Sequence, residues 1–206
     1  MTDPRFPLLA LSRLRMGTDG TGVTTLVAGA GCPLSCRWCI NKKLLRHAPA
    51  EEVSVEELLS RLRCDDLYFR ATGGGVCFGG GEALLHAAFI RRFREICPKE
   101  WKITAETSLH LPRELLALTF GAVDLYVVDC KDMNGEIYYR YTGGDARLMQ
   151  ENLCLLLETV GAEKVLVRVP LIPEYNSEAD QQKSAEALER LGAQRIERFS
   201  YVKCED

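Results

Sequence analysis

The sequence contains no long hydrophobic run. None of its apolar stretches approaches the roughly 20 residues that a helix needs to cross a bilayer. The apolar segment 6–11 is too short for the hydrophobic region of a secretory signal, and Arg13 and Arg15 follow it closely. We therefore expect a cytoplasmic protein that has no membrane partner.

An excess of basic charge is also absent. The 206 residues carry a formal net charge of −3 at pH 7, which gives no general attraction to nucleic acid or to an anionic membrane. The hydrophobic fraction of 47% and the charged fraction of 27% are ordinary for a globular domain with a full core. No linker, repeat or low-complexity segment divides the chain. We predict a single domain over residues 1–206, with residues 1–16 as an N-terminal extension.

Close pairs of cysteines are missing from most of the chain, although it has nine cysteines. An odd number of cysteines without a secretory signal indicates a reducing compartment, and the length of the chain argues against a disulfide scaffold. The six cysteines that stand apart from one another are Cys64, Cys77, Cys97, Cys130, Cys154 and Cys204.

The other three cysteines form a short run, with three residues between Cys32 and Cys36 and two between Cys36 and Cys39. Thiolates at this spacing can hold three irons of a [4Fe–4S] cluster and leave the fourth iron without a protein ligand, which provides a position for chemistry. Zinc and redox thiols are the alternatives. Structural zinc takes four ligands, usually in two separated pairs, and the sequence displays no second pair. The run therefore favours an iron–sulfur site.

Short apolar segments rich in β-formers alternate with longer amphipathic segments. The predicted strands are 23–28, 75–78, 101–107, 123–129, 165–169 and 195–201, and the predicted helices are 54–63, 84–96, 112–118, 147–159 and 178–191. Ser54 and Glu57 form a capping box at the start of the first helix. About six βα units predict an α/β fold with a parallel sheet. Periodicity does not distinguish an open doubly wound sheet from a partial barrel.

Glycine and polar motifs follow the predicted strands at their C-terminal ends. These motifs are the cysteine loop, Gly79–Glu82, Glu106–Ser108, Asp129–Lys131 and Arg168. Because chemistry in parallel α/β folds collects at the carboxyl ends of strands, we expect all five motifs to converge on one face.

Together these segments resemble the glycyl radical enzyme activating enzymes, a family of the radical S-adenosylmethionine (SAM) superfamily. The resemblance covers nearly the whole chain, and its cysteine spacing marks the superfamily. Beyond the cysteine loop, it rests on the segments 16–23, 73–85, 124–133, 141–144 and 168–176. The fold that it implies is a partial (β/α)₆ barrel of the TIM-like kind.

The resemblance also implies cofactors and partners. Cys32, Cys36 and Cys39 would hold a [4Fe–4S] cluster, and SAM would bind its open iron. A flavodoxin or ferredoxin would supply one electron, and SAM would break into methionine and a 5′-deoxyadenosyl radical. That radical would remove a hydrogen atom from a glycine of a partner glycyl radical enzyme. In such a reaction the cofactor carries the difficult chemistry and the protein positions it.

Individual site residues follow from the same resemblance. Asp129, Lys131 and Arg168 would act at the reacting centre and contact SAM and the substrate. Glu106 and Thr107 would hold a monovalent cation beside the SAM carboxylate. The other residues expected to bind the cofactor are Trp38, Asn41, Gly80, Gly81 and Glu82.

The sequence departs from the family pattern at several positions. Ile40 and Val202 stand where the family usually has histidines, and Glu106 and Ser108 stand in a segment that reads Asp-Thr-Asn-Gly in the family. No ferredoxin-like insert follows the cysteine loop. Two alternatives therefore stay open: radical chemistry performed directly on a peptide or small molecule, and a cluster-binding electron-transfer protein that uses no SAM.

Overall fold

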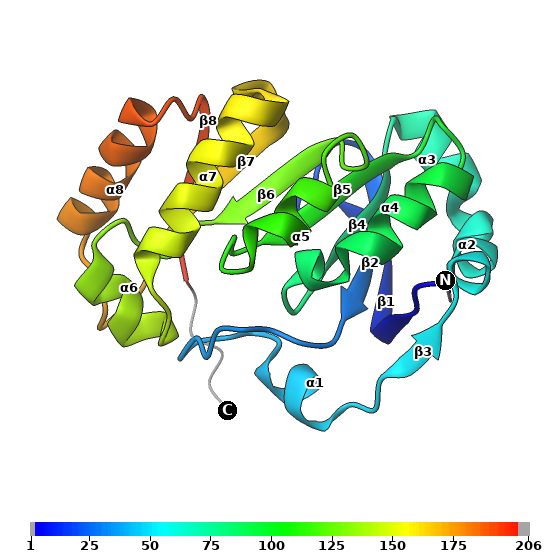
Figure 1. The fold of residues 1–206 in the computed structure, drawn as a ribbon, viewed down its shortest axis with the longest axis horizontal. Helices are drawn as coiled ribbons and strands as arrows, with labels where there is room; N and C mark the ends of the chain where they lie inside the picture. Colours follow the sequence, from blue (N-terminus) through cyan, green and yellow to red (C-terminus); the bar gives the residue numbers. More distant parts are fainter. Residues whose placement is uncertain (1–2, 202–206) are drawn as a thin grey trace.

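The computed structural model describes residues 3–201, so Val202 and Cys204 lie outside the described residues. Its centre is an eight-stranded sheet with the strand order β3-β1-β2-β4-β5-β6-β7-β8 (Figure 1). The six strands from β2 to β8 in that order are parallel to one another. They are β2 (Val23–Gly29), β4 (Gly75–Gly80), β5 (Lys102–Thr107), β6 (Leu125–Asp129), β7 (Val165–Leu171) and β8 (Arg195–Ser200). The predicted α/β class with six parallel strands is confirmed.

The two remaining strands run antiparallel to their neighbours, and the sequence pattern did not predict them. β1 (Phe6–Met16) pairs with β2 on one side and with β3 (Glu51–Val53) on the other. Residues 6–16 are therefore part of the sheet and not an extension from the domain. Their side chains do not alternate strictly between apolar and polar, and the pairing with β2 contains register shifts, so the period-2 signal of a strand is lost.

Helices connect the parallel strands much as the amphipathic segments indicate. Ser54 begins the helix α2 (Val55–Leu62) with the predicted capping box, in which Ser54 and Glu57 exchange side-chain to backbone hydrogen bonds. The other predicted helices are η2 (Ala83–His86) continuing into α4 (Ala87–Ile96), α5 (Arg113–Leu118), α7 (Ala146–Val160) and α8 (Glu178–Arg190). The elements that were not predicted are α1 (Lys42–His47), η1 (Arg63–Asp65), α3 (Asp66–Thr72), α6 (Gly135–Thr142) and η3 (Ala162–Lys164).

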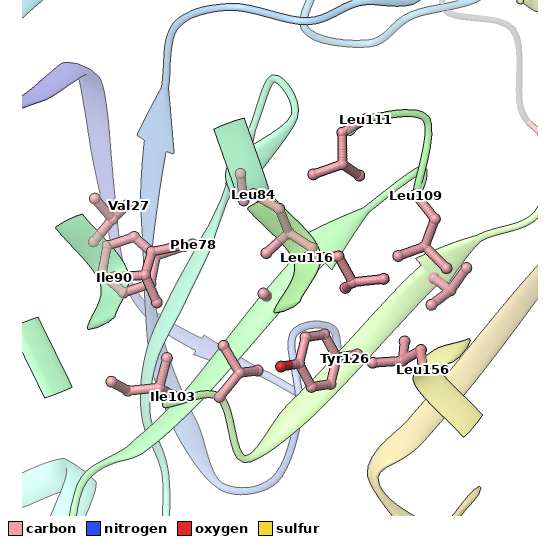
Figure 2. Packing of buried hydrophobic residues seen from close by; sticks show 14 of the residues in the cluster. Val27, Phe78, Leu84, Ile90, Ile103, Leu109, Leu111, Leu116, Tyr126 and Leu156 are labelled. Atoms are coloured by element: carbon pink, nitrogen blue, oxygen red, sulfur yellow. The ribbon is translucent and has the colours of Figure 1, made fainter. Parts of the chain in front are cut away.

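One hydrophobic core lies between the sheet and these helices. Alternate strand residues such as Phe78, Ile103 and Tyr126 pack with the helix residues Ile90 and Leu116 (Figure 2). Each fully buried side chain of this size stabilises the fold by about 1.5–3 kcal/mol. Figure 1 shows α4, α5 and α7 across the same side of the sheet.

The opposite face of the parallel strands carries charged residues at its carboxyl end. Glu106, Asp129 and Arg168 occupy the positions that alternate with core residues such as Val128 and Val167. A doubly wound sheet carries helices on both faces, whereas the strands of a barrel present one face to an outer layer of helices. The one-sided core fits the barrel-type arrangement, and within the described residues the sheet does not close, since β3 and β8 are its outer strands.

None of the helices within residues 3–201 combines the length and the apolar character needed to span a bilayer.

Candidate functional site

The cysteine loop leaves the carboxyl end of β2 and leads into α1. Two backbone hydrogen bonds anchor it to the end of α6: Ser35 N donates to Thr142 O at 2.9 Å, and Arg37 N donates to Tyr141 O at 3.1 Å. Leu34 is buried, so its side chain anchors the segment between Cys32 and Cys36. The backbone that carries the three thiols is therefore held in a fixed conformation.

All three cysteines of the run line a single cavity of about 570 Å³. Cys32 is exposed, Cys36 and Cys39 are half-buried, and none of them forms a disulfide. Burial raises the pKa of Cys32, and it raises that of Cys36 to about 11. Iron binds thiolates, so occupation of the site by a metal must displace these protons.

The donor set fits a cluster better than a single ion. Among residues 3–201 no three His, Cys, Asp or Glu side chains are grouped closely enough to hold one metal ion. A tetrahedral zinc site needs four ligands at about 2.0–2.3 Å from one centre. A multi-iron cluster accepts thiolates that are farther apart, each on its own iron. The three thiols in one cavity fit a [4Fe–4S] cluster in which one iron has no cysteine ligand.

The Gly-Gly-Glu turn after β4 is bonded directly to the cysteine loop. Asn41 Nδ2 donates to Gly80 O at 2.8 Å, and Glu82 N donates to Gly31 O at 2.8 Å. A Cβ on Gly81 would lie 2.0 Å from Gly31 O, closer than any real side chain permits. Glycine is therefore required here for the close approach of two backbone segments, in addition to the ligand approach that the sequence suggested.

Glu82 is buried at the base of this turn. Its Oε2 accepts hydrogen bonds from Ser108 N at 2.8 Å and Ser108 Oγ at 2.7 Å, and its Oε1 accepts one from Leu84 N at 3.2 Å. Burial raises the pKa of Glu82, although these hydrogen bonds act in the opposite direction. The carboxylate is held rigidly below the cysteine loop. Sequence reasoning missed Ser108 as its partner, and the position of Ser108 at the end of β5 was the only signal.

A row of ion pairs, which we call the strand-end row, crosses the carboxyl ends of β5 to β8. It consists of Glu106, Asp129, Lys131, Arg168, Glu197 and Tyr201. Lys131 Nζ lies 2.8 Å from Asp129 Oδ2 and 2.7 Å from Tyr201 Oη. Arg168 lies 3.1 Å from Glu106 and 3.0 Å from Glu197, and it also donates to Thr18 O. The predicted residues Asp129, Lys131, Arg168 and Glu106 are thus brought together.

Lys131 carries the central positive charge of this row. Its side chain is almost completely buried, and burial alone would lower its pKa, but the Asp129 carboxylate raises the pKa well above the ordinary value. The Lys131 ammonium also lowers the pKa values of Cys32 and Cys36, in opposition to their burial. The strand-end row is therefore electrostatically coupled to the cysteine loop.

Tyr201 is a site residue that the sequence did not suggest. Its hydroxyl accepts from Lys131, its ring lies 5.5 Å from the same ammonium, and burial raises its pKa. Its ring also contacts Phe199 at the end of β8. Tyr201 is 70 residues from Lys131 along the chain, and only the fold brings them together.

The role expected for Glu106 and Thr107 in holding a monovalent cation stays a prediction. Glu106 and Thr107 are consecutive on β5 and therefore point to opposite faces. Glu106 pairs with Arg168, while Thr107 Oγ1 accepts a hydrogen bond from Leu109 N at 2.9 Å. Burial and the nearby Asp129 and Asp19 carboxylates raise the pKa of Glu106 to about 7, against the pull of Arg168.

Trp38 is half-buried within the cysteine loop, and it is not among the residues that line the cavity of the three thiols. The structure places this side chain beside the cluster ligands without defining an adenine pocket around it. The role expected for Trp38 in binding the cofactor stays a prediction.

Residues 26–192 match the sequence profile of the Radical SAM superfamily. The chain is 26% identical to the (2S)-3-sulfopropanediol sulfolyase activating enzyme of Bilophila wadsworthia, over 89% of the chain and 81% of that enzyme. It is 31% identical to the pyruvate formate-lyase 1-activating enzyme of Escherichia coli K12, over 79% of the chain.

The chain spans 66% of that second relative and 40% of a third, the (2S)-3-sulfopropanediol dehydratase activating enzyme of Klebsiella oxytoca, to which it is 33% identical over 62% of its own length. Among solved structures, Streptococcus suis SuiB bound to S-adenosylmethionine matches 84% of the chain and 39% of SuiB, with a TM-score of 0.65 and 14% identity. The enzyme anSMEcpe with bound AdoMet and a peptide matches 87% of the chain and 51% of anSMEcpe, with a TM-score of 0.64 and 14% identity. These structural matches bear on the fold.

Proposed function

The chain belongs to the radical SAM superfamily, and from this premise we propose that it cleaves SAM reductively to methionine and a 5′-deoxyadenosyl radical. Members of the superfamily use a [4Fe–4S] cluster and SAM, which are therefore the cofactors of this chain. The observation that carries the proposal is the cysteine loop itself. Its three thiols line one cavity, and its backbone is bonded to the Gly-Gly-Glu turn.

The cluster and SAM, when bound, supply the one-electron cleavage of the sulfonium bond, and the protein residues position the reactants. Cys32, Cys36 and Cys39 hold the cluster. Glu82, fixed by Ser108, accepts a hydrogen bond from the SAM ammonium. A buried carboxylate with a rigid orientation is suited to this task because no reorganisation is needed when the cation arrives.

The strand-end row supplies the opposite charge. Lys131 and Arg168 bind the carboxylate or the ribose oxygens of SAM, and Asp129 and Tyr201 hold Lys131 in place. Arg168 is oriented by two carboxylates at once, Glu106 and Glu197. Ligand binding at this row exchanges one set of charge-assisted hydrogen bonds for another and does not require a free charge to be buried.

The substrate that we propose is a glycine of a partner glycyl radical enzyme. The support for it is that the curated relatives named above are activating enzymes of lyases and dehydratases. We further propose that the reductant is a flavodoxin or ferredoxin and that the protein works anaerobically in the cytoplasm. All eight cysteines within the described residues are free thiols, in keeping with a reducing compartment.

The first test is anaerobic reconstitution with iron and sulfide, followed by addition of dithionite and SAM. We expect methionine and 5′-deoxyadenosine in equal amounts, measured by liquid chromatography and mass spectrometry. Reconstituted protein that binds iron but forms no 5′-deoxyadenosine would refute the proposed reaction.

The second test concerns the substrate. A glycyl radical enzyme encoded beside this chain is added to the same reaction, and the expected result is the doublet of a glycyl radical in the EPR spectrum of that partner. Formation of 5′-deoxyadenosine without the doublet would instead favour direct modification of a peptide or small molecule.

A further inference from the structure

Tyr138, on α6, has a buried hydroxyl group that makes no hydrogen bond. Its side chain is 0% exposed, and within residues 3–201 its Oη has no hydrogen-bond partner. An unpaired buried hydroxyl destabilises a folded protein, so the great majority of such groups are bonded to protein, water or a ligand. The hydroxyl of Tyr138 therefore has an unused capacity to bind a polar group.

Another tyrosine of the core shows how such a hydroxyl is ordinarily accommodated. Tyr126 is also 0% exposed, but its hydroxyl lies 2.9 Å from Thr119 Oγ1 and donates to Thr119 O at 3.1 Å. Both tyrosine rings pack among the apolar residues of the core. A phenylalanine would fill the space of Tyr138 without leaving a polar group unpaired, so packing alone does not account for a tyrosine at this position.

The hydroxyl of Tyr138 lies close to the charged groups of the proposed SAM site. Burial raises the pKa of Tyr138, the charges of Cys36 and Glu82 raise it further, and a nearby ammonium, that of Lys131, lowers it. Such electrostatic effects decline with distance, so the hydroxyl is near these groups. Tyr138 is not among the residues that line the cavity of the three thiols. Its hydroxyl is thus placed between Glu82 and the strand-end row.

His110 adds a second unpaired polar atom beside Tyr138. Its Nδ1 is buried and, among the described residues, has no hydrogen-bond partner. Its ring centroid lies 6.4 Å from that of Tyr138. His110 belongs to the loop after β5, two residues beyond the Ser108 that bonds Glu82. Unpaired polar atoms that converge from two different elements indicate a site for a polar ligand.

We infer that Tyr138 is a further cofactor-binding residue, whose hydroxyl donates a hydrogen bond to the carboxylate of SAM. This inference rests on the proposed function, in which Glu82 accepts a hydrogen bond from the SAM ammonium. The ammonium and the carboxylate of SAM stand on the same carbon atom, so a donor close to Glu82 is within reach of the carboxylate. The bond is charge-assisted, which makes it roughly twice as strong as a bond between neutral groups.

The SAM carboxylate needs more donors than Lys131 can offer. An ammonium has three N–H donors, and the bonds to Asp129 Oδ2 and Tyr201 Oη already take two of those of Lys131. A carboxylate, in contrast, accepts about four hydrogen bonds. Tyr138 can supply one of them without giving up a bond within the protein, because its hydroxyl proton is unused.

The test compares Tyr138→Phe with the wild type in the binding of two ligands, SAM and decarboxylated SAM, which lacks only the carboxylate. Binding to the reconstituted, oxidised protein is measured by titration calorimetry. We expect the variant to bind SAM about tenfold more weakly or worse, and to bind decarboxylated SAM like the wild type. Tyr126→Phe removes a buried hydroxyl outside the site and is the matched control, which should bind both ligands like the wild type.

A second measurement requires neither the cluster nor SAM. The equilibrium constant for unfolding of the apoprotein, from urea denaturation, should fall about tenfold in Tyr138→Phe, because this substitution removes an unpaired buried hydroxyl. The same constant should rise about fivefold in Tyr126→Phe, which removes a hydroxyl that is bonded to Thr119. The two variants should therefore change stability in opposite directions.

The inference is overturned if Tyr138→Phe binds SAM as tightly as the wild type does. It is also overturned if the variant weakens both ligands equally, since the hydroxyl then does not act on the carboxylate. A loss of stability in Tyr138→Phe would overturn it as well, because a buried water then pairs the hydroxyl with His110. Wild-type protein that binds SAM but forms no 5′-deoxyadenosine with dithionite refutes the proposed reaction alone, because neither measurement on Tyr138 depends on turnover.

Discussion

The cysteine loop and the strand-end row both lie at the carboxyl ends of the parallel strands, but their functional groups are held in opposite ways. In the loop, Cys32 is exposed and the backbone carries the hydrogen bonds that fix the segment. In the row, every charged group already has a partner in the protein, as Lys131 has Asp129 and Arg168 has Glu106. The loop is organised to give its side chains to a ligand, whereas the row is organised to be stable without one.

This difference separates two kinds of functional residue. Within the described residues, Cys32 is exposed and forms no contact with the core, so its replacement should affect the bound group and not the fold. The row residues contribute both to ligand binding and to the stability of the fold, because a buried charge that loses its partner destabilises the protein. Substitutions in the loop should therefore reduce activity without changing stability, whereas substitutions in the row should reduce both.

The largest effect is expected in the loop. Cys32→Ser should abolish 5′-deoxyadenosine formation, a loss of at least about a thousandfold, because a weak oxygen ligand replaces a thiolate on one iron. The midpoint of urea unfolding of the apoprotein should stay unchanged, since Cys32 is exposed. Cys64→Ser is the matched control, an exposed cysteine outside the loop, and should keep full iron content and activity. A Cys32→Ser protein that retains its activity would break the comparison.

The next effect is expected in the row. Lys131→Met removes the ammonium that Asp129 and Tyr201 share, and it should weaken SAM binding by about a hundredfold, as the loss of a buried charge partner does. The apoprotein should also lose about 1–3 kcal/mol of its free energy of unfolding. Tyr201→Phe removes one hydrogen bond and keeps the ring, so its effect on both quantities should be smaller. Titration calorimetry with SAM and urea unfolding measure the two effects.

An unchanged stability of Lys131→Met, together with weaker SAM binding, would show that the row behaves like the loop. The opposite result, a loss of stability with unchanged SAM binding, would remove Lys131 from the ligand site and leave it a structural role only.

The contact between the two regions provides the third prediction. Gly81→Ala places a Cβ 2.0 Å from Gly31 O and must push the Gly-Gly-Glu turn away from the cysteine loop. We expect a loss of about 2 kcal/mol in the free energy of unfolding, as for other overpacked positions, and a lower iron content after reconstitution. Gly135→Ala, whose Cβ would have no heavy atom within 4 Å, is the control and should match the wild type in both measurements.

The sequence predicted local features of this structure well. The capping box at Ser54 depends on residues three apart, and the cysteine loop on residues within one short segment, so spacing alone is sufficient for both. The six parallel strands were also predictable, because buried strands are nearly continuous apolar runs. Local sequence thus located the parallel strands and the main helices.

Contacts between distant segments were not predictable in the same way. Tyr201 reaches Lys131 across 70 residues, and Arg168 reaches Thr18 O across 150 residues. β1 escaped prediction because its place in the sheet depends on pairing with β2 and β3 and not on a pattern of its own. The loop was therefore predictable and the partners within the row were not, since a row across several strands exists only in the folded chain.

The smallest expected effect is the pH dependence that Glu106 gives to the strand-end row. Its pKa of about 7 in the folded protein lies above the ordinary value of 4.5 because of burial and the neighbouring Asp129 and Asp19 carboxylates. Between these two values the folded chain binds a proton that the unfolded chain has released, so stability falls as the pH rises from about 4.5 to 7 and levels off above that range.

Glu106→Gln cannot ionise and lacks this fall in stability. Relative to the wild type, its free energy of unfolding should therefore rise by about 2 kcal/mol between pH 5 and pH 8, as measured by urea denaturation of the two apoproteins at each pH. Glu197→Gln removes the other carboxylate that pairs with Arg168 and serves as the matched control. If the difference between Glu106→Gln and the wild type stays constant from pH 5 to pH 8, Glu106 is ionised throughout, and the strand-end row is a fixed set of ion pairs whose charge does not respond to pH in this range.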